Sequence, residues 1–462
     1  MNPSFLAQDS IVALATPRGE GAIGVVRLSG PDSIALASSF MTLSSVPRQA
    51  RLSVFHHKGR RIDQVIATIF HGPKSFTGED MVEISCHGGE SILRQVIECL
   101  VQAGARLAER GEFSQRAFFN GKMDLLQAEA VADIISARTA ESGRAALSNL
   151  EGRLSGKIRE IRNALVEAAA SLEVAVDHSD DPTVGTALTF REIGESLDAQ
   201  AKNIGRLLRS YESGRLLKEG VKIAIAGRPN SGKSSLLNSL LSFDRAIVSP
   251  HPGTTRDTLE EGFDLLGIPA VLIDTAGLRA HSADPVEKIG MERTHRAIQE
   301  SDMAVVVLDS ASEVSTEDEN IARLMNGKKV VVALNKNDLP PQADMPRVRS
   351  LFPNKPMVSI SALKGHGMQN LLESLRGQIS GILIEEKIEN SETVVTSIRH
   401  RDCLARANES LARAWEVIRK GGAEELAALE IRETLESLGE LTGESAQDDI
   451  LKKIFSGFCI GK

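Results

Sequence analysis

The chain has 462 residues, of which 42% are hydrophobic and 25% charged, and its formal net charge is −8. One hydrophobic core does not serve a chain of this length, so we expect two to four domains of an ordinary soluble protein. The acidic balance and the 3% aromatic content argue against a protein that grips nucleic acid through its own basic or base-stacking surface.

The N-terminus and the cysteines favour a cytoplasmic protein. No basic residue precedes the apolar patch at residues 11–15, so a secretory signal is not expected. The purely apolar runs are far shorter than a membrane span, which predicts no membrane association. Four cysteines (Cys86, Cys99, Cys403 and Cys459) have no paired spacing, so we expect reduced thiols rather than a disulfide or zinc framework.

The first part of the chain, residues 1–121, mixes short β-rich runs with Gly and Pro turns. This texture predicts an α+β domain. The expected strands cover residues 11–15, 24–28, 64–70 and 81–85, followed by a helix over residues 89–103.

From residue 122 the pattern becomes helical and continues to residue 216. Apolar residues recur at steps of three and four, which predicts one face of a long helix. These residues are Leu147, Leu150, Leu154, Ile158, Ile161 and Leu165.

The pattern changes again over residues 217–381, where strand-like and helix-like segments alternate. This order predicts a parallel sheet covered on both faces. Helical texture returns over residues 382–462, so we expect an all-α domain made of residues 122–216 and 382–462, with the α/β domain inserted into it. The expected strands of the inserted domain cover residues 221–226, 270–274, 303–309, 329–334 and 357–361.

A glycine-rich turn follows the first of these strands. Residues 227–234 read GRPNSGKS, and a helix is expected to begin near Lys233. A strand, such a turn and a helix form a P-loop, whose backbone N–H groups and helix N-terminus attract phosphate. Lys233 would bridge the β- and γ-phosphates, and Ser234 would bind Mg²⁺. The other residues expected against the nucleotide here are Asn230, Ser231, Gly232 and Ser235.

Three later motifs complete a guanine-nucleotide site. Residues 274–277 read DTAG (Asp274, Thr275, Ala276, Gly277), where the aspartate suits a water-mediated Mg²⁺ contact and the glycine N–H suits the γ-phosphate. Residues 335–338 read NKND (Asn335, Lys336, Asn337, Asp338), and the last carboxylate can accept both N–H groups on the guanine edge, a pair that adenine lacks. The loop that supports the base is expected at Ser361, Ala362 and Leu363.

The segment between the P-loop helix and Asp274 predicts a switch. Residues 251–257 read HPGTTRD, and a threonine here can close over the γ-phosphate and Mg²⁺. Leu278 stands where small signalling GTPases have a glutamine that orients water, so another polar group must serve. Glu287 is close in sequence, although by itself it reads as a solvated helix residue.

These motifs, together with both ends of the chain, resemble the MnmE (TrmE) family of bacterial tRNA-modification GTPases. Ordinary GTPases share only the central domain, so the terminal motifs make the resemblance specific. They read ATP at residues 15–17, GVVRLSG at 24–30, SFTGED at 75–80, HGG at 87–89, RGEFS at 110–114, RAFFNGK at 116–122 and FCIGK at 458–462.

The resemblance implies a folate-binding, dimerising N-terminal domain and a helical domain interrupted by a Ras-like P-loop GTPase domain. It implies work with the FAD-dependent protein MnmG, in a heterotetramer that binds tRNA mainly through that partner. The pair would install an aminomethyl or carboxymethylaminomethyl group at C5 of the tRNA wobble uridine, with 5-formyltetrahydrofolate or a related folate as one-carbon source. GTP hydrolysis would need K⁺ and follow dimerisation of the GTPase domains.

The resemblance also implies roles for single residues. Glu287 matches the catalytic glutamate, and Thr255 matches the switch threonine on Mg²⁺. The implied potassium positions are Asn230, Ser249, His251 and Thr254, of which Ser249 and Thr254 also belong to the expected nucleotide site. The implied folate positions are Arg27, Glu83, Lys122 and Lys462.

The chain departs from the family pattern at two potassium positions. His251 stands where an aliphatic residue is common, and Ser249 where threonine is common. If both offer backbone carbonyls the ion site survives, whereas a protonated imidazole turned inward would weaken it. Cys459 reads equally as a buried small hydrophobe or as a group near the folate.

The motifs also fit a second function without modification chemistry: a GTPase switch that acts in RNA or ribosome assembly through its own RNA surface. The acidic balance and the lack of an RNA-binding appendage argue against it. Stimulation by K⁺ over Na⁺ and binding of folate would distinguish the two.

Overall fold

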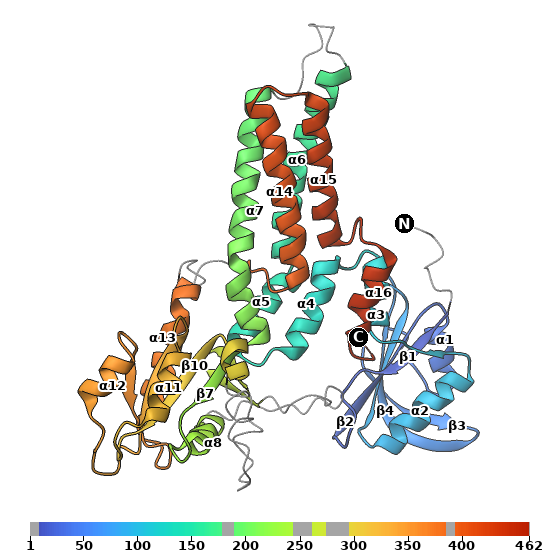
Figure 1. Cartoon of the computed structure of the whole chain (residues 1–462). Helices are drawn as coiled ribbons and strands as arrows, with labels where there is room; N and C mark the ends of the chain where they lie inside the picture. Colours follow the sequence, from blue (N-terminus) through green and yellow to red (C-terminus); the bar gives the residue numbers. More distant parts are fainter. Residues whose placement is uncertain (1–8, 178–188, 244–260, 274–294, 385–392, 462) are drawn as a thin grey trace. The chain divides into compact units, whose positions relative to one another are not determined.

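The computed structural model of the chain describes residues 9–177, 189–243, 261–273, 295–384 and 393–461 (Figure 1). The chain divides into two compact units. Unit 1 comprises Met1–Ala132, Leu150–Ala169 and Ala428–Lys462, and unit 2 comprises Asp133–Asn149 and Ala170–Ala427. Among the described helices, none combines the length and apolarity that crossing a bilayer requires.

Unit 1 is built on a six-stranded sheet in the order β3-β4-β5-β2-β1-β6. Its strands pair antiparallel except β1 and β6, which are parallel. Alternation along each strand sends one set of apolar side chains into a core with α1 and α2 (Figure 1). The elements are β1 (Ile11–Leu14), β2 (Ile23–Ser29), α1 (Ser33–Ser38), β3 (Arg51–His57), β4 (Arg60–Phe70), β5 (Met81–His87), α2 (Glu90–Gln102) and β6 (Arg106–Leu107).

The opposite face of this sheet carries the polar positions and several exposed apolar ones. Leu52 pairs with Ile66, which pairs with Ser85 on the next strand, so these side chains share one face. Leu52 and Ile23 are each 64% exposed and Ile66 is 45% exposed. Arg27 and Glu83 form a cross-strand pair on the same face, and they belong to the pocket described below.

Helical segments and the end of the chain complete unit 1. α3 (Glu112–Phe119) packs Phe113 against the sheet strand β1, and α16 (Asp448–Ser456) packs against α3. Ile460 forms an isolated β-bridge with Arg110, so the last described residues run beside the N-terminal sheet. α4 (Leu125–Ser136), α6 (Arg153–Asp177) and α15 (Glu424–Thr442) each contribute residues to both units.

Unit 2 contains the second six-stranded sheet, in the order β12-β11-β10-β7-β9-β8. All its neighbours pair in parallel except β8, which is antiparallel to β9. The central strands are buried almost throughout, as strands covered on both faces must be. The strands are β7 (Val221–Ala226), β8 (Glu261–Leu265), β9 (Ile268–Ile273), β10 (Met303–Asp309), β11 (Lys329–Asn335) and β12 (Met357–Ser359).

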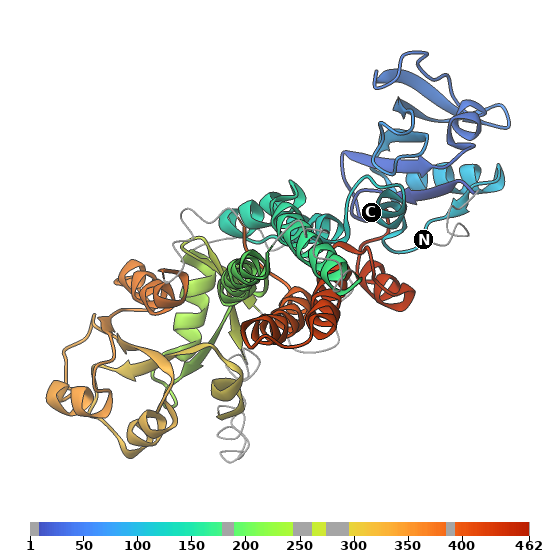
Figure 2. The same ribbon diagram turned by 90° about the horizontal axis from the view of Figure 1, so that it is seen from above.

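Two long helices of unit 2, α7 (Phe190–Glu219) and α14 (Ile398–Arg419), lie side by side (Figures 1 and 2). α7 begins with a capping box at Thr189 and ends one residue before β7. Its Leu216 belongs to the same apolar core as the sheet. Further helices are α5 (Ala140–Leu150), α8 (Lys233–Phe243), α11 (Thr316–Leu324), α12 (Met345–Leu351) and α13 (Met368–Ile384).

The predicted fold class is confirmed, but one predicted helix is wrong. The apolar run from Leu147 to Leu165 belongs to two helices, because α5 ends at Leu150 and α6 begins at Arg153. Gly152 lies between them with φ +83°, a conformation that does not continue a helix. Leu147 is 48% exposed, whereas Leu154, Ile158 and later members of the run are buried.

Other differences concern elements that the pattern missed. β3 and α3 were not predicted, and β8 adds an antiparallel edge to a sheet expected to be parallel. β3 lacks a regular alternation of buried and exposed residues, because Phe55 is the only fully buried residue of this strand. Strand β8 is joined to β9 by a two-residue turn at Leu266 and Gly267, both with positive φ, so the pair is a hairpin.

Candidate functional site

The first site lies where β7 ends and α8 begins. Gly227 has no room for a side chain, since a Cβ there would lie 2.6 Å from the carbonyl oxygen of Val307. Gly232 has φ +99°, and its Cβ would lie 2.0 Å from Nδ2 of Asn335. The two glycines therefore let the turn pass close to neighbouring backbone and side chains, as a phosphate-binding loop requires.

Lys233 is the first residue of α8 and closes back over this turn. Its Nζ donates to the carbonyl oxygens of Gly227 at 2.7 Å and Arg228 at 2.8 Å. Burial lowers the pKa of Lys233 from its ordinary value, while the nearby charge of Glu317 acts in the opposite direction. A cation held among neutral carbonyls at a helix N-terminus is well placed to gain from an anionic ligand.

A single buried amide joins three predicted parts of the site. Asn335, 3% exposed, donates from Nδ2 to the carbonyl oxygen of Ser231 at 2.9 Å. Its Oδ1 accepts the backbone N–H of Ala362 at 2.9 Å. The glycine-rich loop, the 335–338 segment and the 361–363 loop thus meet at one side chain. They lie at the carboxyl ends of β7 and β11 and after β12, where parallel sheets bind ligands.

The residues after Asn335 form a charged rim. The pKa of Asp338 is lowered chiefly by a hydrogen bond from Ser361, and Lys364 Nζ lies 3.4 Å from its Oδ2. Asp338 is therefore a carboxylate at neutral pH, able to accept N–H groups. Lys336, with φ +64°, donates to Asp309 Oδ2 at 2.6 Å. Burial raises the pKa of Asp309, but the hydrogen bond from Lys336 and others outweigh it and lower that pKa.

The remaining predicted nucleotide residues fall into two groups. Asn230 is exposed with φ +58°, Ser234 and Ser235 are half-buried in the first turn of α8, and Leu363 is 83% exposed. The second group lies outside the described residues. It comprises Ser249, His251, Thr254, Thr255, Asp274, Thr275, Ala276, Gly277 and Glu287 of the expected nucleotide, metal and catalytic sites, and Lys462 of the expected folate site.

The second site lies in unit 1, at the Arg27–Glu83 pair. Arg27 donates from Nε and Nη2 to Glu83 Oε1, at 3.0 and 2.7 Å, and from Nη1 to the carbonyl oxygen of Gly461 at 3.3 Å. Its guanidinium carbon lies 5.1 Å from the ring centroid of Phe76 and 5.7 Å from that of Phe113. Aromatic faces and a carboxylate fix this cation in place.

A pocket of about 380 Å³ opens beside this pair. Lys122, which was predicted as a folate position, lines it and donates from Nζ to the carbonyl oxygen of Pro73 at 2.8 Å. The volume is in the range of small-molecule sites. The lining residues are Arg48, Phe70, Lys74, Ser75, Phe76, Met81, Glu83 and Lys122.

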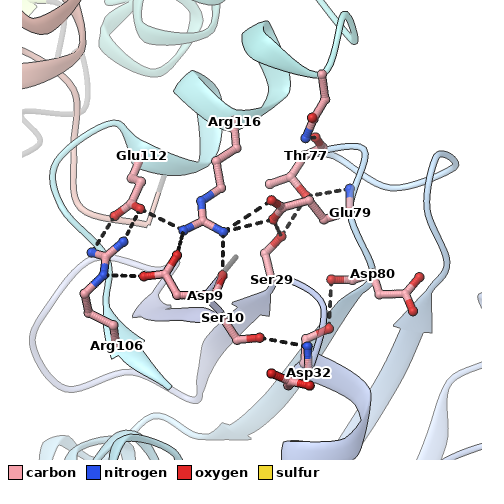
Figure 3. Close-up of polar contacts among 12 residues, drawn as sticks. Asp9, Ser10, Ser29, Asp32, Thr77, Glu79, Asp80, Arg106, Glu112 and Arg116 are labelled. Carbon is pink, nitrogen blue, oxygen red and sulfur yellow. Dashed lines mark hydrogen bonds and ion pairs between the residues drawn. The ribbon is translucent and has the colours of Figure 1, made fainter. Parts of the chain in front are cut away.

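A buried ionic network holds the loop that forms one wall of this pocket (Figure 3). Arg116, 5% exposed, lies at its centre and donates to Asp9 Oδ1 at 2.7 Å, Glu112 Oε1 at 3.0 Å and Glu79 Oε1 at 3.2 Å. Glu79 in turn accepts the hydroxyl of Ser29 at 2.8 Å. The network ties the wall segment, residues 74–80, to β2 and α3.

The sequence reasoning missed Arg48, Lys74 and Phe76 of the pocket, and it assigned no role to Arg116. Phe76 and Arg116 stand inside the motifs at residues 75–80 and 116–122, so a signal for them was present. Arg48 has no such signal, because only the folded sheet brings it to the pocket.

Two protein-family models match the chain. The MnmE helical domain matches residues 125–459, and the N-terminus of the GTP-binding protein TrmE matches residues 10–122. The tRNA modification GTPase MnmE of Aquifex aeolicus is 42% identical over 461 residues, which cover 98% of this chain and 100% of that protein. This chain belongs to the MnmE family.

Two further relatives support this membership of the MnmE family. The tRNA modification GTPase MnmE of Bacillus subtilis is 40% identical and that of Thermotoga maritima 38% identical, each over 98% of this chain and 100% of the relative. As a member of the MnmE family the chain is a GTPase.

Proposed function

We propose that this chain is the GTP-hydrolysing component of a system that modifies C5 of the tRNA wobble uridine. It would act with the FAD-dependent protein MnmG and a folate one-carbon donor, and would add an aminomethyl or carboxymethylaminomethyl group. The observation that carries the proposal is the presence, in one chain, of a glycine-rich loop joined through Asn335 to the 361–363 loop, and of a pocket lined by Glu83 and Lys122 beside Arg27. Full-length similarity to MnmE proteins supports it.

The nucleotide half of the proposal assigns GTP and Mg²⁺ to the loop at residues 227–234. Lys233 is partly desolvated and donates to the backbone oxygens of Gly227 and Arg228, so it fits a phosphate partner. Ser234 follows it at the N-terminus of α8 and would hold Mg²⁺, together with Thr255. The metal would neutralise phosphate charge. Asp338 would accept the two guanine N–H groups, and Ala362 would support the base.

Potassium is assigned to Asn230, Ser249, His251 and Thr254. Asn230 supports this assignment because it stands exposed in the P-loop in the left-handed conformation that asparagine tolerates, so its side chain is accessible. A cation here would do the work of an arginine finger, worth about 10³–10⁵ in rate. Its binding would accompany the meeting of two GTPase domains, and Glu287 would act on the attacking water.

The N-terminal pocket is assigned to 5-formyltetrahydrofolate or a related folate. Arg27, Glu83 and Lys122 come from three separate parts of the sequence and lie at or beside one pocket. A carboxylate and a guanidinium can pair with the donors and acceptors of a pterin ring, and aromatic Phe76 offers an apolar surface. Lys462 would follow Gly461, whose carbonyl oxygen already accepts from Arg27.

A homodimer through the N-terminal sheet is part of the proposal. Ile23, Leu52 and Ile66 leave apolar surface exposed on the face of the sheet opposite the core. Apolar side chains are commonly exposed on such a face when a second copy of the chain covers them. The acidic net charge supports tRNA binding mainly through MnmG, and the protein is proposed to reside in the cytoplasm.

We propose the domain boundaries that the sequence pattern predicts. The N-terminal domain covers residues 1–121, the inserted GTPase domain covers residues 217–381, and the helical domain covers residues 122–216 and 382–462. The match of one family model to residues 10–122 and the change of texture at β7 support them.

The proposal is tested by nucleoside mass spectrometry on tRNA from a strain that lacks this chain. The modified wobble uridines should disappear, and return when the gene is restored. Restoring a Glu287→Ala variant should leave the uridines unmodified although the variant still binds GTP. Normal uridine modification without the chain would contradict the proposal.

The potassium assignment has its own test. GTP hydrolysis by the full chain should be several-fold to many-fold faster in KCl than in NaCl at equal ionic strength. Equal rates in the two salts would contradict it.

A further inference from the structure

The N-terminal pocket is cationic, although the chain as a whole is acidic. Arg48, Lys74 and Lys122 line it, and Glu83 is the one carboxylate among the lining residues. Glu83 is already paired with Arg27 at 2.7 Å. Because that pair is neutral, the three cations have no ion-pair partner among the described residues, around one opening of a protein with net charge −8.

The three cations converge on one short turn. Arg48 donates from Nη2 to the carbonyl oxygen of Lys74 at 2.7 Å, and Lys122 donates from Nζ to that of Pro73 at 2.8 Å. Lys74 itself follows Pro73 and is exposed. The cationic rim, as we call Arg48, Lys74 and Lys122, therefore comes from three parts of the sequence but occupies one side of the pocket.

Arg48, one of the three residues of the cationic rim, has an unusual backbone conformation. Its φ is +62°, the left-handed region, and its N–H donates to the carbonyl oxygen of Ile69 at 2.8 Å. This conformation costs a residue with a Cβ about 1 kcal/mol or more compared with glycine. A long cationic side chain at such a position is explained if the guanidinium has a function there.

The two carboxylates at the end of the wall segment, Glu79 and Asp80, have other partners. Asp80 accepts the N–H of Gly72 at 2.9 Å and lies 3.3 Å from Nδ1 of His71. Glu79 accepts from Arg116 and from Ser29. Neither carboxylate lines the pocket, so the rim presents its positive charge to a ligand.

We propose that the cationic rim binds the carboxylates of a γ-linked glutamyl chain, so that the pocket selects folates that carry several glutamates. The proposal rests on the proposed function, in which this pocket takes a folate. A folate with one glutamate has two carboxylates, and every further glutamate adds one. Three cations at the mouth of the pocket match a chain of carboxylates better than the single glutamate does.

The test compares 5-formyltetrahydrofolate carrying one glutamate with the same compound carrying three, by calorimetric titration of the full-length protein. The wild type should bind the triglutamate about five- to tenfold more tightly, as expected for two or three exposed ion pairs. Raising the salt concentration should reduce that ratio, because exposed ion pairs are screened.

Two variants locate the effect. Lys74→Glu reverses one rim charge at a position with ordinary backbone, and Arg48→Gln/Lys74→Gln removes two. Both should weaken binding of the triglutamate more than binding of the monoglutamate, so that the preference for the triglutamate is lost. Arg60→Gln/Arg61→Gln removes two exposed cations at the far end of β4 from the pocket residue Phe70 and should keep the preference.

The outcomes separate this proposal from the folate assignment. If the wild type binds both compounds with equal affinity, the rim proposal is overturned and the folate site stands. If the rim variants keep the preference, the rim is not its source and the proposal is overturned. If neither compound binds, the folate assignment itself fails, and the rim proposal fails with it.

Discussion

The two sites of this protein are built in different ways. The proposed nucleotide site takes its described groups from short loops at the carboxyl ends of parallel strands, and one buried amide, Asn335, holds two of those loops together. The N-terminal pocket takes Arg48, Glu83 and Lys122 from separate strands and loops beside Arg27. The ion pairs of Arg116 with Asp9, Glu79 and Glu112 support its wall.

The two sites therefore depend on different features of the chain. Backbone geometry defines a phosphate loop, so glycines and a lysine at fixed spacing suffice to specify it. The pocket depends on the whole sheet and on ion pairs that must all be satisfied, since a buried charge without its partner is costly. Four predictions test the contrast.

The largest effect is expected at the centre of the ionic network. Arg116→Met would leave Glu79, Glu112 and Asp9 without their shared cation, at a cost of about 3–5 kcal/mol. Thermal and denaturant unfolding of the full chain should show the N-terminal unit unfolding earlier, while GTP hydrolysis by the intact protein at low temperature is retained.

The matched control is Arg94→Met, which removes an exposed arginine that pairs with Glu98 at 3.9 Å on α2. A surface pair of this kind is worth less than about 1 kcal/mol. Equal destabilisation by the two variants would show that the buried network has no special role.

The next effect concerns the amide in the nucleotide site. Asn335→Ala would leave the carbonyl of Ser231 and the N–H of Ala362 without their partner, at about 1–3 kcal/mol each. We expect at least about a tenfold rise in KM for GTP. The control is Asn337→Ala. The side chain of Asn337 is exposed, two residues after Asn335, so this variant should change the KM for GTP little. A normal KM in Asn335→Ala would contradict the bridging role.

A smaller and more selective change is expected from Asp338→Asn. The amide cannot accept both guanine N–H groups, so the preference for GTP over ATP in competition binding should fall by roughly an order of magnitude. Folate binding should not change, since Asp338 lies in unit 2 and the pocket in unit 1. An unaltered preference for GTP would remove Asp338 from base recognition.

The smallest effect is the response to acid. Burial raises the pKa of Glu112 and Asp9, but hydrogen bonds from Arg106 and Arg116 outweigh it and hold both below their ordinary values of 4.5 and 3.8. A carboxyl whose folded pKa is lowered stabilises the fold above its ordinary pKa and loses that contribution as pH falls. The N-terminal unit should therefore lose stability as pH drops below about 4.5, and lose less in Arg116→Met.

The sequence predicted much of the nucleotide region because local patterns carry it. Strand β7, the turn and the start of α8 at Lys233 follow from residue type and spacing alone. The antiparallel β8 was missed, because the hairpin at Leu266 and Gly267 has no strong turn signal apart from its glycine.

The pocket was predicted less completely, because it depends on long-range pairing. Arg27 and Glu83 are 56 residues apart, and nothing local in the sequence says that β2 and β5 are neighbours. Only the resemblance to MnmE proteins brought those two residues forward. Arg48 lies outside the family motifs at residues 75–80 and 116–122, so its side chain could be assigned to the pocket only from the folded structure.

Our central proposal is that one chain holds a guanine-nucleotide site and a separate folate pocket at the Arg27–Glu83 pair. Calorimetric titration of the full-length protein with 5-formyltetrahydrofolate tests it most directly. We predict one molecule bound per chain by the wild type, binding at least about tenfold weaker in Arg27→Met, and unchanged GTP binding in that variant. Absence of folate binding by the wild type, or equal affinity in Arg27→Met, would contradict the account.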